Sequence, residues 1–372
     1  MKIVQFVGSF GMGGAETLVK NYALLMHEAG EDVTVLCLKN IKSPYDQELK
    51  QKGVKVVYVS EKLHIEGESL FQKVLRRLAS YVYVRYFFKK YKPDIIHFHL
   101  ELSNLLRFAG LPKNTKIFYT HHNDAQAWVT DPKRKNDVNC MKWLIAHYPV
   151  QIIALHEQMR DTINKAFNIT NTIVLNNGID MQRFKNARPR NVVRDELGIP
   201  RDALVVGHVG RFNPVKNHEF LVKIFKAIKG KMHNAFILII AGEGGGYEEE
   251  IVRLISELRL EDSCMILHNR TDVPDLMRAM NIMIFPSHNE GQPVTLIEAQ
   301  ATGINVLASM AVNDEVLMSN HAERMSLSES PEAWAQKAID MCNDDTPNEY
   351  HNLNNWDIRQ QIKTLLEYYR KA

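Results

Sequence analysis

Two carboxylates with seven residues between them are the sharpest chemical signal in the sequence. Glu290 lies in a turn after a predicted strand, and Glu298 lies about one turn into the helix that follows. The first N–H groups of a helix have no partner within it, so this helix start can bind a polar ligand. One carboxylate could hold sugar hydroxyls and the other a ribose diol. The alternative is a loop ion pair and an ordinary acid on the helix surface.

Two cations lie five residues apart in the loop after another predicted strand, 204–209. Arg211 supplies a planar fork of donors and Lys216 a mobile point charge. This pair suits two adjacent phosphates that gain negative charge when a bond to them breaks. The pattern is typical of a diphosphate clamp. A pair of solvated loop cations is the alternative and, from these residues alone, the simpler interpretation.

A glycine-rich turn, Gly11–Gly14, joins the first predicted strand to the first helix, where backbone amides can meet a phosphate. The dinucleotide-binding pattern is incomplete, because Glu16 stands where its third glycine belongs and no acid follows the second strand at 38–40. The P-loop motif is absent from the sequence. The turn therefore indicates phosphate contact, with a ligand-free turn as the alternative.

Predicted strands alternate with predicted helices along the chain, which is typical of parallel sheets with helices on both faces. The strands fall into two series, and we expect two doubly wound α/β domains that face each other across a ligand-binding cleft. The strands are expected at 2–7, 33–38, 54–59, 94–98, 116–119, 152–155 and 172–175, and then at 204–209, 236–241, 265–268, 282–285 and 305–307.

Composition excludes several classes of protein. A chain of 372 residues is long enough for two domains, and a formal charge of +3 gives no nucleic-acid footprint. The four cysteines form no C-x-x-C pair, so we predict no metal site and expect reduced thiols in a cytoplasmic protein. Residues 1–7 form a strand pattern rather than a signal peptide, and no apolar run approaches the roughly 20 residues of a membrane span.

The chain resembles the retaining GT-B glycosyltransferases of family four, of the type that assembles bacterial polysaccharide and lipopolysaccharide. The resemblance covers nearly the whole chain, and the order of its motifs is more specific than any one of them. The matching elements are Gly13-Gly14-Ala15-Glu16, Asn177-Gly178-Ile179-Asp180, Gly210-Arg211-Phe212 with Lys216-Asn217, Ala241-Gly242-Glu243-Gly244, and Glu290 through Glu298 followed by Ala299.

The resemblance implies a nucleotide-diphosphate sugar donor held mainly by the second domain. By position, Arg211 and Lys216 correspond to the diphosphate cations, Glu290 to the contact with the donor sugar and Glu298 to the ribose contact. The cations would do the work of a metal, so no metal or other cofactor is expected. The remaining donor-binding positions are expected at Gly13 and Gly14 of the first domain and at Gly291, Gln292, Pro293 and Val294 of the second.

Members of this family usually have a functional histidine where the strand 116–119 ends. His122 best matches its position, directly before Asn123-Asp124, and His121 is the rival. Its expected role is contact with the transferred sugar and with transition-state charge. Family enzymes are usually discussed in terms of front-face transfer, in which the leaving phosphate takes the acceptor proton, and double displacement stays open.

The sequence departs from the family pattern at Gln292, where leucine is frequent, and at Asn281, where an acid often begins the strand. Both positions are expected near the donor pocket, and they leave the identity of the sugar open. A UDP-sugar is favoured over a GDP-sugar because the resemblance is to polysaccharide-assembly enzymes. The same motifs would also suit a non-catalytic nucleotide-sugar or glycan-binding protein, or a phosphorylase-like or epimerase-like enzyme.

The predicted helix 70–91 mixes cations with aromatic and aliphatic residues, as helices that lie on anionic bilayers do. We expect it to dock on the inner face of the cytoplasmic membrane and to receive a polyprenyl-diphosphate-linked glycan. The alternative is a surface helix whose apolar face belongs to the core. By resemblance, the last helix, 355–372, should pack on the first domain, 1–186, with a linker at 187–195 and the second domain at 196–354.

Overall fold

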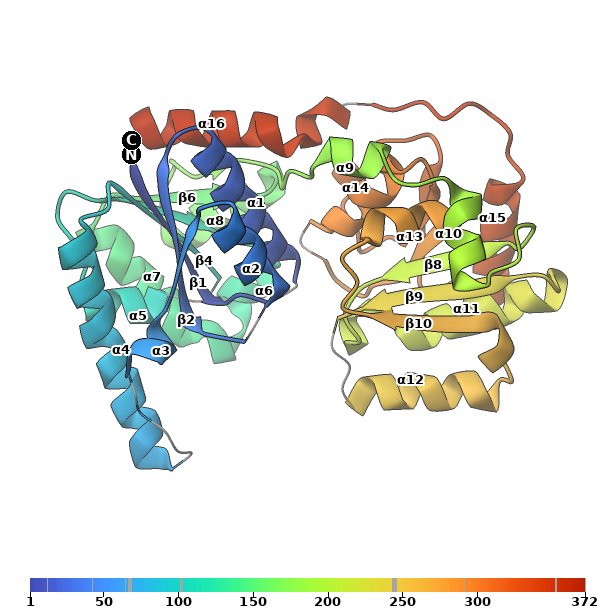
Figure 1. The fold of residues 1–372 in the computed structure, drawn as a ribbon, viewed down its shortest axis with the longest axis horizontal. Coiled ribbons are helices and arrows are strands. Elements are labelled where there is room, and N and C mark those ends of the chain that lie inside the picture. Colours follow the sequence, from blue (N-terminus) through green and yellow to red (C-terminus); the bar gives the residue numbers. More distant parts are fainter. Residues whose placement is uncertain are drawn as a thin grey trace. The chain divides into compact units, whose positions relative to one another are not determined.

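The computed structural model describes residues 1–371 except 12, 42, 64, 66–68, 101–102, 243–245, 291 and 352. The chain forms two compact units. The N-terminal unit comprises Met1–Gly178 and Ile358–Ala372, and the C-terminal unit comprises Ile179–Asp357 (Figure 1). The last helix thus belongs to the N-terminal unit.

The N-terminal unit contains a seven-stranded sheet in the order β3-β2-β1-β4-β5-β6-β7, and every neighbouring pair is parallel. The order reverses between β1 and β4, which makes their carboxyl ends the expected place for a ligand. The strands are β1 (Lys2–Ser9), β2 (Asp32–Lys39), β3 (Lys55–Tyr58), β4 (Ile95–His99), β5 (Lys116–Thr120), β6 (Val150–Ala154) and β7 (Ile173–Val174).

Helices cover both faces of this sheet, because each buried strand presents apolar residues alternately to its two sides. In β1, Val4 and Phe6 pack with α4, α5, α7 and α8, whereas Ile3 and Val7 pack with α1 and α16. The helices of the unit are α1 (Gly14–Glu28), α2 (Pro44–Gln51), α3 (Val59–Leu63), α4 (Leu70–Tyr91), α5 (Ser103–Ala109), α6 (Ala125–Thr130), η1 (Pro132–Arg134), α7 (Lys135–His147), α8 (Glu157–Phe167) and α16 (Ile358–Lys371).

The C-terminal unit contains a six-stranded parallel sheet in the order β10-β9-β8-β11-β12-β13. Its strands are β8 (Val205–Val209), β9 (Phe236–Ala241), β10 (Cys264–His268), β11 (Ile282–Phe285), β12 (Asn305–Ser309) and β13 (Ala322–Met325). The prediction of two doubly wound α/β domains is confirmed. The edge strand β13 was not predicted, because its sequence Ala-Glu-Arg-Met lacks a buried apolar run.

The helices of the C-terminal unit flank its sheet in the same way. They are α9 (Met181–Lys185), α10 (Arg190–Leu197), η2 (Pro214–Lys216), α11 (His218–Lys231), α12 (Gly246–Glu257), η3 (Glu261–Ser263), α13 (Val273–Ala279), α14 (Val294–Ala301), η4 (Asp314–Val316), α15 (Pro331–Cys342) and η5 (Leu353–Trp356). No helix in the described part of the chain combines the length and the hydropathy that crossing a bilayer requires.

The segment expected as a linker, 187–195, is instead part of the C-terminal unit and contains most of α10. Its polar composition is misleading because Arg194 is buried and uses its guanidinium to bind the main chain. The group donates hydrogen bonds to the carbonyl oxygens of Ala279 (2.8 Å) and Ala203 (3.0 Å). The chain passes from one unit to the other at 178–179 and at 357–358.

Candidate functional site

Topology brings together the predicted site residues of the C-terminal unit. The strand order reverses between β8 and β11, so their carboxyl ends flank the place where open α/β sheets bind ligands. Arg211 and Lys216 follow β8, and Glu290 and Glu298 follow β11. Residues far apart in the sequence therefore share one edge of one sheet. Gly291, a further predicted position, lies outside the described residues.

Lys216 and Glu290 form an ion pair, with 2.6 Å between Nζ and Oε1. The side chains are 23% and 13% exposed, and the Lys216 ammonium lies 4.7 Å from the ring centroid of Phe285. The sequence assigned these two residues to different parts of a ligand and did not predict their contact. The pair holds the lysine in place, and a phosphate that reached Nζ would meet a positioned cation.

The two loops that carry this pair are tied together by main-chain atoms. The Asn213 side chain accepts from the Val215 N–H (2.9 Å) and starts the short helix η2. The His288 N–H donates to the Val215 carbonyl (2.8 Å), and the Asn217 side-chain amide donates to the Pro286 carbonyl (3.2 Å). The position of Lys216 is therefore set by the loop after β11 as well as by its own.

Arg211 is exposed and forms no ion pair with any residue that the structure describes. A Cβ built on Gly242, at the end of β9, would lie 3.7 Å from Arg211 Cγ, so the arginine stem passes beside this glycine. The guanidinium is thus available to an anion from solvent. This arrangement is compatible with the predicted diphosphate contact, which stays a prediction.

The helix α14 begins after the carboxyl end of β11, where an anion is predicted to bind. Pro293 is its N-cap and supplies no side-chain hydrogen bond, so the first N–H groups are not satisfied by a cap. Gln292 and Pro293 are buried, and Val294 is partly buried. Their predicted contact with the donor stays a prediction.

Glu298 lies in the second turn of α14, and its carboxyl group has an unusual acidity. Burial raises its pKa from 4.5 to about 7, because a buried carboxylate loses hydration. The charge of Arg183 on α9 acts in the opposite direction. At neutral pH the group is therefore partly protonated. Its ionised form is the stronger hydrogen-bond acceptor for the two hydroxyls of a diol.

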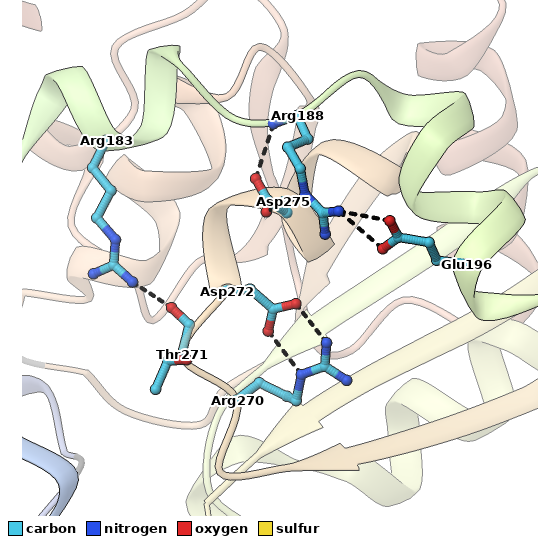
Figure 2. Close-up of polar contacts among 7 residues, drawn as sticks. All are labelled: Arg183, Arg188, Glu196, Arg270, Thr271, Asp272 and Asp275. Atoms are coloured by element: carbon cyan, nitrogen blue, oxygen red, sulfur yellow. Dashed lines mark hydrogen bonds and ion pairs between the residues drawn. The ribbon is translucent and has the colours of Figure 1, made fainter.

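Arg183 belongs to a polar cluster that sequence reasoning missed (Figure 2). Its guanidinium donates to the Thr271 carbonyl, next to an ion pair between Arg270 and Asp272. Arg188 bridges Asp275 and Glu196, each at 2.7 Å. The cluster fixes α9 and α10 against α13. It thereby holds Arg183, whose charge partly offsets the rise that burial causes in the pKa of Glu298. Its members come from segments far apart in the sequence, which is why spacing could not predict it.

Asn281 does not lie near the donor pocket, contrary to the expectation from sequence. It precedes β11 and therefore sits at the amino end of the sheet, opposite the edge that carries Glu290. Its Oδ1 atom accepts from Arg194 (2.7 Å) and from the Val205 N–H (2.8 Å). Asn281 therefore links α10 to the start of β8.

In the N-terminal unit, the glycine turn leads directly into α1. Gly13 is the N-cap in an extended conformation (φ −84°, ψ 169°) and makes no side-chain cap. The Glu16 carboxylate folds back against Gly13, into the space that a Cβ there would occupy. A carboxylate is favoured at a helix N-terminus by the helix dipole. The anion position predicted at Gly13 and Gly14 is thus bordered by this acid.

The structure places the two candidate histidines in different environments. His121 is buried, stacks on Trp128 with 4.3 Å between ring centroids, and contacts the Tyr119 hydroxyl at 2.9 Å. His122 is only partly buried, and its Nε2 atom lies 2.9 Å from His99 Nδ1. The packing of His121 is typical of a core residue, and the preference for His122 as the functional histidine stays a prediction.

A buried hydrogen-bond chain connects His122 with the last helix. His99 Nε2 lies 2.8 Å from Gln5 Oε1, and Gln5 Nε2 donates to the Tyr369 hydroxyl (3.3 Å). Because the Gln5 oxygen can only accept, His99 carries its proton on Nε2. Burial lowers the pKa of His99 well below its usual range, so the ring is neutral and Nδ1 accepts from His122 Nε2–H. His122 therefore keeps Nδ1 as an acceptor.

His122 is a neutral ring in this arrangement. Burial, with a smaller contribution from the nearby His121, lowers its pKa to about 3. A neutral ring that donates at Nε2 can accept a hydrogen bond from a ligand hydroxyl at Nδ1, which favours a sugar contact over a phosphate contact. The same chain continues from Tyr369 to His97 Nδ1 (2.6 Å) and from His97 Nε2 to Thr120 Oγ1 (2.7 Å).

The sequence held one signal of this chain. In the strand Ile95–His99, His97 and His99 alternate with apolar residues, which places both rings on one face of β4. Because β4 neighbours both β1 and β5, that face is shared with Gln5 and with the end of β5. Among the described residues, no group of three or more His, Cys, Asp and Glu side chains is arranged to hold a metal ion.

Comparison with known proteins agrees with this architecture. The family model described as Glycosyltransferase Family 4 matches residues 12–183, and the model described as Glycosyl transferases group 1 matches residues 189–356. The Bacillus subtilis (strain 168) protein EpsF, named as a glycosyltransferase, is 28% identical over 350 residues, which cover 90% of this chain and 86% of EpsF.

Two further proteins are similar to the chain. An Escherichia coli protein named UDP-Gal:alpha-D-GlcNAc-diphosphoundecaprenol alpha-1,3-galactosyltransferase is 26% identical over 259 residues, 66% of this chain and 65% of that protein. The crystal structure of Anabaena Alr3699/HepE in complex with UDP and glucose matches with a TM-score of 0.77 and 18% identity over 100% of both chains. From the two family models and the shared fold, the chain belongs to the family-4-like glycosyltransferases of the GT-B fold.

Proposed function

We propose that the protein transfers a sugar, with retention of anomeric configuration, from a UDP-sugar to a glycan acceptor. The acceptor is a lipid-linked oligosaccharide of surface polysaccharide biosynthesis. The observation that carries the proposal is the gathering of Arg211, the Lys216–Glu290 pair and the uncapped start of α14 at the carboxyl ends of β8 and β11. This set offers cations and N–H groups for a diphosphate beside a carboxylate for sugar hydroxyls.

In the proposed reaction, the bond between the anomeric carbon and the diphosphate oxygen breaks while the acceptor oxygen bonds to the same face of that carbon. The electron pair of the broken bond stays on the leaving phosphate, where Lys216 and Arg211 stabilise the growing charge. The acceptor hydroxyl gives its proton to the leaving phosphate oxygen. Glu290 holds hydroxyls of the transferred sugar, and the neutral His122 accepts a hydrogen bond from another.

Three findings support a UDP-sugar and a lipid-linked acceptor. The structure of Anabaena Alr3699/HepE contains UDP and glucose, and another structure of that protein contains UDP-glucose. The Escherichia coli relative is named for a UDP-Gal donor and a GlcNAc-diphosphoundecaprenol acceptor. We extend both features to this chain, with the ribose held by Glu298.

We propose further that transfer needs no metal ion, because two cationic side chains and a helix start neutralise the diphosphate. Calorimetry with the purified protein and a panel of UDP- and GDP-sugars, with and without EDTA, tests the donor assignment and the metal independence of binding. We expect tight binding of one UDP-sugar that EDTA leaves unchanged. Preferred binding of a GDP-sugar would overturn the donor assignment, and loss of binding in EDTA would overturn metal independence.

An acceptor assay separates transfer from mere binding. With the identified donor, we expect product only when a polyprenyl-diphosphate-linked glycan is added, and an anomeric configuration equal to that of the donor by NMR. Conversion of the donor without acceptor would point to an epimerase-like or hydrolytic enzyme. Tight donor binding without transfer to any of these acceptors would favour a non-catalytic binding protein.

A further inference from the structure

The helix α4 exposes an unusual number of large apolar side chains. Leu70 is 80% exposed, Phe71 76% and Val82 69%, although side chains of this kind are normally buried. On α5, Phe108 is 56% exposed, and its ring lies 5.5 Å from that of Tyr81. We call the whole set the α4 surface: Leu70, Phe71, Val74, Leu75, Leu78, Val82, Tyr86 and Phe108.

These side chains share one side of the helix. The α4 members recur mostly at intervals of three or four residues, which places them on a continuous stripe. The buried side chains of α4, which pack on the core, are Val84, Phe87 and Phe88, and all three lie in the last part of the helix. The helix is thus anchored at its C-terminal end, and its first turns extend past the rest of the N-terminal unit (Figure 1).

The exposed turns are a formed helix rather than a frayed end. Ser69 accepts from the Gln72 N–H (3.2 Å), and the Gln72 side chain accepts from the Ser69 N–H (3.1 Å), which is a complete capping box. The apolar stripe is therefore organised before any partner binds. The alternative expected from sequence, in which the apolar face belongs to the core, holds only for the last turns.

The charges of α4 determine which partner fits the stripe. Within residues 70–91 there is no Asp or Glu. Arg77 and Arg85 lie among the exposed apolar turns, and Lys89 and Lys90 lie in the last turn. The six cations of the helix are Lys73, Arg76, Arg77, Arg85, Lys89 and Lys90. A purely apolar partner would bury these charges, whereas an anionic bilayer offers acyl chains to the stripe and phosphates to the cations.

We propose that the α4 surface docks on an anionic bilayer, with its apolar side chains below the headgroups and the exposed cations of α4 among the lipid phosphates. The docking extends the proposed function, because a lipid-linked acceptor is presented at a bilayer. It does not depend on that function, since binding uses no donor and no residue of the sugar site.

Vesicle flotation with the full chain tests the proposal. Vesicles of phosphatidylcholine with phosphatidylglycerol are compared with vesicles of phosphatidylcholine alone, each at low and high salt. We expect binding to the anionic vesicles at low salt, and at least a tenfold weaker partition at high salt or without the anionic lipid. Absence of binding to the anionic vesicles at low salt would overturn the proposal.

Matched variants locate the contact. The double variant Phe71→Ser/Val82→Ser and the charge variant Arg85→Gln/Lys89→Gln should each bind anionic vesicles at least tenfold more weakly. The controls are Val252→Ser on α12, which removes an apolar side chain that is 46% exposed, and Lys142→Gln on α7, which removes an exposed cation of the same unit. Equal binding by the α4 variants and the controls would overturn the assignment.

A second copy of this chain is the competing occupant, and sedimentation velocity distinguishes it. The membrane proposal would be overturned if the wild type forms a dimer and binds no vesicles, and if Phe71→Ser/Val82→Ser dissociates that dimer. Donor calorimetry on the same variant separates the two proposals. We expect the variant to keep the UDP-sugar affinity of the wild type. If the wild type binds vesicles but no donor, the proposed function is contradicted and the membrane proposal stands.

Discussion

At the scale of single residues, the C-terminal unit combines two carboxylates whose environments differ. Glu290 is held in an ion pair with Lys216, whereas Glu298 has a pKa that burial raises to about 7. The first is paired with a cation, and the second changes its charge near neutral pH. Their substitutions therefore have different expected consequences.

The variants Lys216→Ala and Glu290→Ala should each lower kcat severely, by about 10²- to 10³-fold, the usual effect of removing one group that stabilises transition-state charge. Folding should change little, because the paired side chains retain contact with solvent. Initial rates and thermal melting measure both effects. The control is Lys223→Ala, which breaks an exposed ion pair with Glu219 on α11. Near-normal transfer by both site variants would show that the site assignment is wrong.

Glu298 should make donor binding depend on pH. Its folded-state pKa of about 7 lies above the ordinary 4.5, so donor affinity should fall as the pH drops through 7 and the carboxylate takes a proton. Stability runs in the opposite direction. Between pH 4.5 and 7 only the unfolded chain ionises this group, so the free energy of unfolding decreases as the pH rises through that window.

The variant Glu298→Gln separates these two effects. At pH 8 the variant should be more stable than the wild type, by at most about 3 kcal/mol in the free energy of unfolding. At pH 4 the two stabilities should be alike. The donor affinity of the variant should be lower than that of the wild type at pH 8. It should also lack the pH dependence between pH 6 and 8 that Glu298 causes in the wild type. Titration calorimetry over pH 6–8 and thermal melting measure these quantities, and a pH-independent difference in stability would contradict the raised pKa.

At the scale of elements, the last helix does more than close the sheet of the N-terminal unit. Through Tyr369, α16 contacts Gln5 and His97, and through them it is linked to His99 and the candidate site histidine. Its apolar residues at 358, 362, 365, 366 and 369 hold it against that unit. The orientation of His122 thus depends on an element at the far end of the sequence.

The variant Tyr369→Phe tests this dependence. Removing the hydroxyl takes one hydrogen bond from Gln5 Nε2 and one from His97 Nδ1, both buried, and should destabilise the protein by about 1–3 kcal/mol. If the hydrogen-bond chain positions His122, kcat should also fall several-fold at temperatures well below unfolding, while donor affinity is kept. The matched control is Tyr368→Phe, whose side chain is partly exposed on the same helix. A loss of stability with unchanged kcat would show that the hydrogen-bond chain has only a structural role.

At the scale of the whole molecule, the two passages of the chain between the units are built tightly. In the N-terminal unit, a Cβ on Gly178 would lie 2.5 Å from Ile358 Cα, so only glycine allows the start of α16 to approach. In the C-terminal unit, the Ile179 N–H donates to the Trp356 carbonyl at 2.8 Å. The two passages are therefore held beside each other, by the Gly178–Ile358 contact and by the Ile179–Trp356 hydrogen bond.

The variant Gly178→Ala should therefore destabilise the N-terminal unit, by about 1–3 kcal/mol, since the contact is with backbone and one side must move. Gly230→Ala is the control. Gly230 lies within α11, where an added Cβ meets nothing within 4 Å, and alanine there should stabilise by about 0.5–1 kcal/mol. Denaturant unfolding measures both, and equal effects of the two substitutions would contradict the close approach.

The sequence alone determined the alternation of strands and helices, the doubly wound class and the family, because these follow from local periodicity and from motifs such as Glu290 to Glu298. Only the tertiary structure decided that Lys216 pairs with Glu290, that Asn281 serves α10, that 187–195 is helical and that His99 orients His122. The physical reason is that these outcomes depend on partners brought together by strand order. Spacing along the chain carries information about one element, whereas the partner of a buried polar group is set by the neighbouring elements.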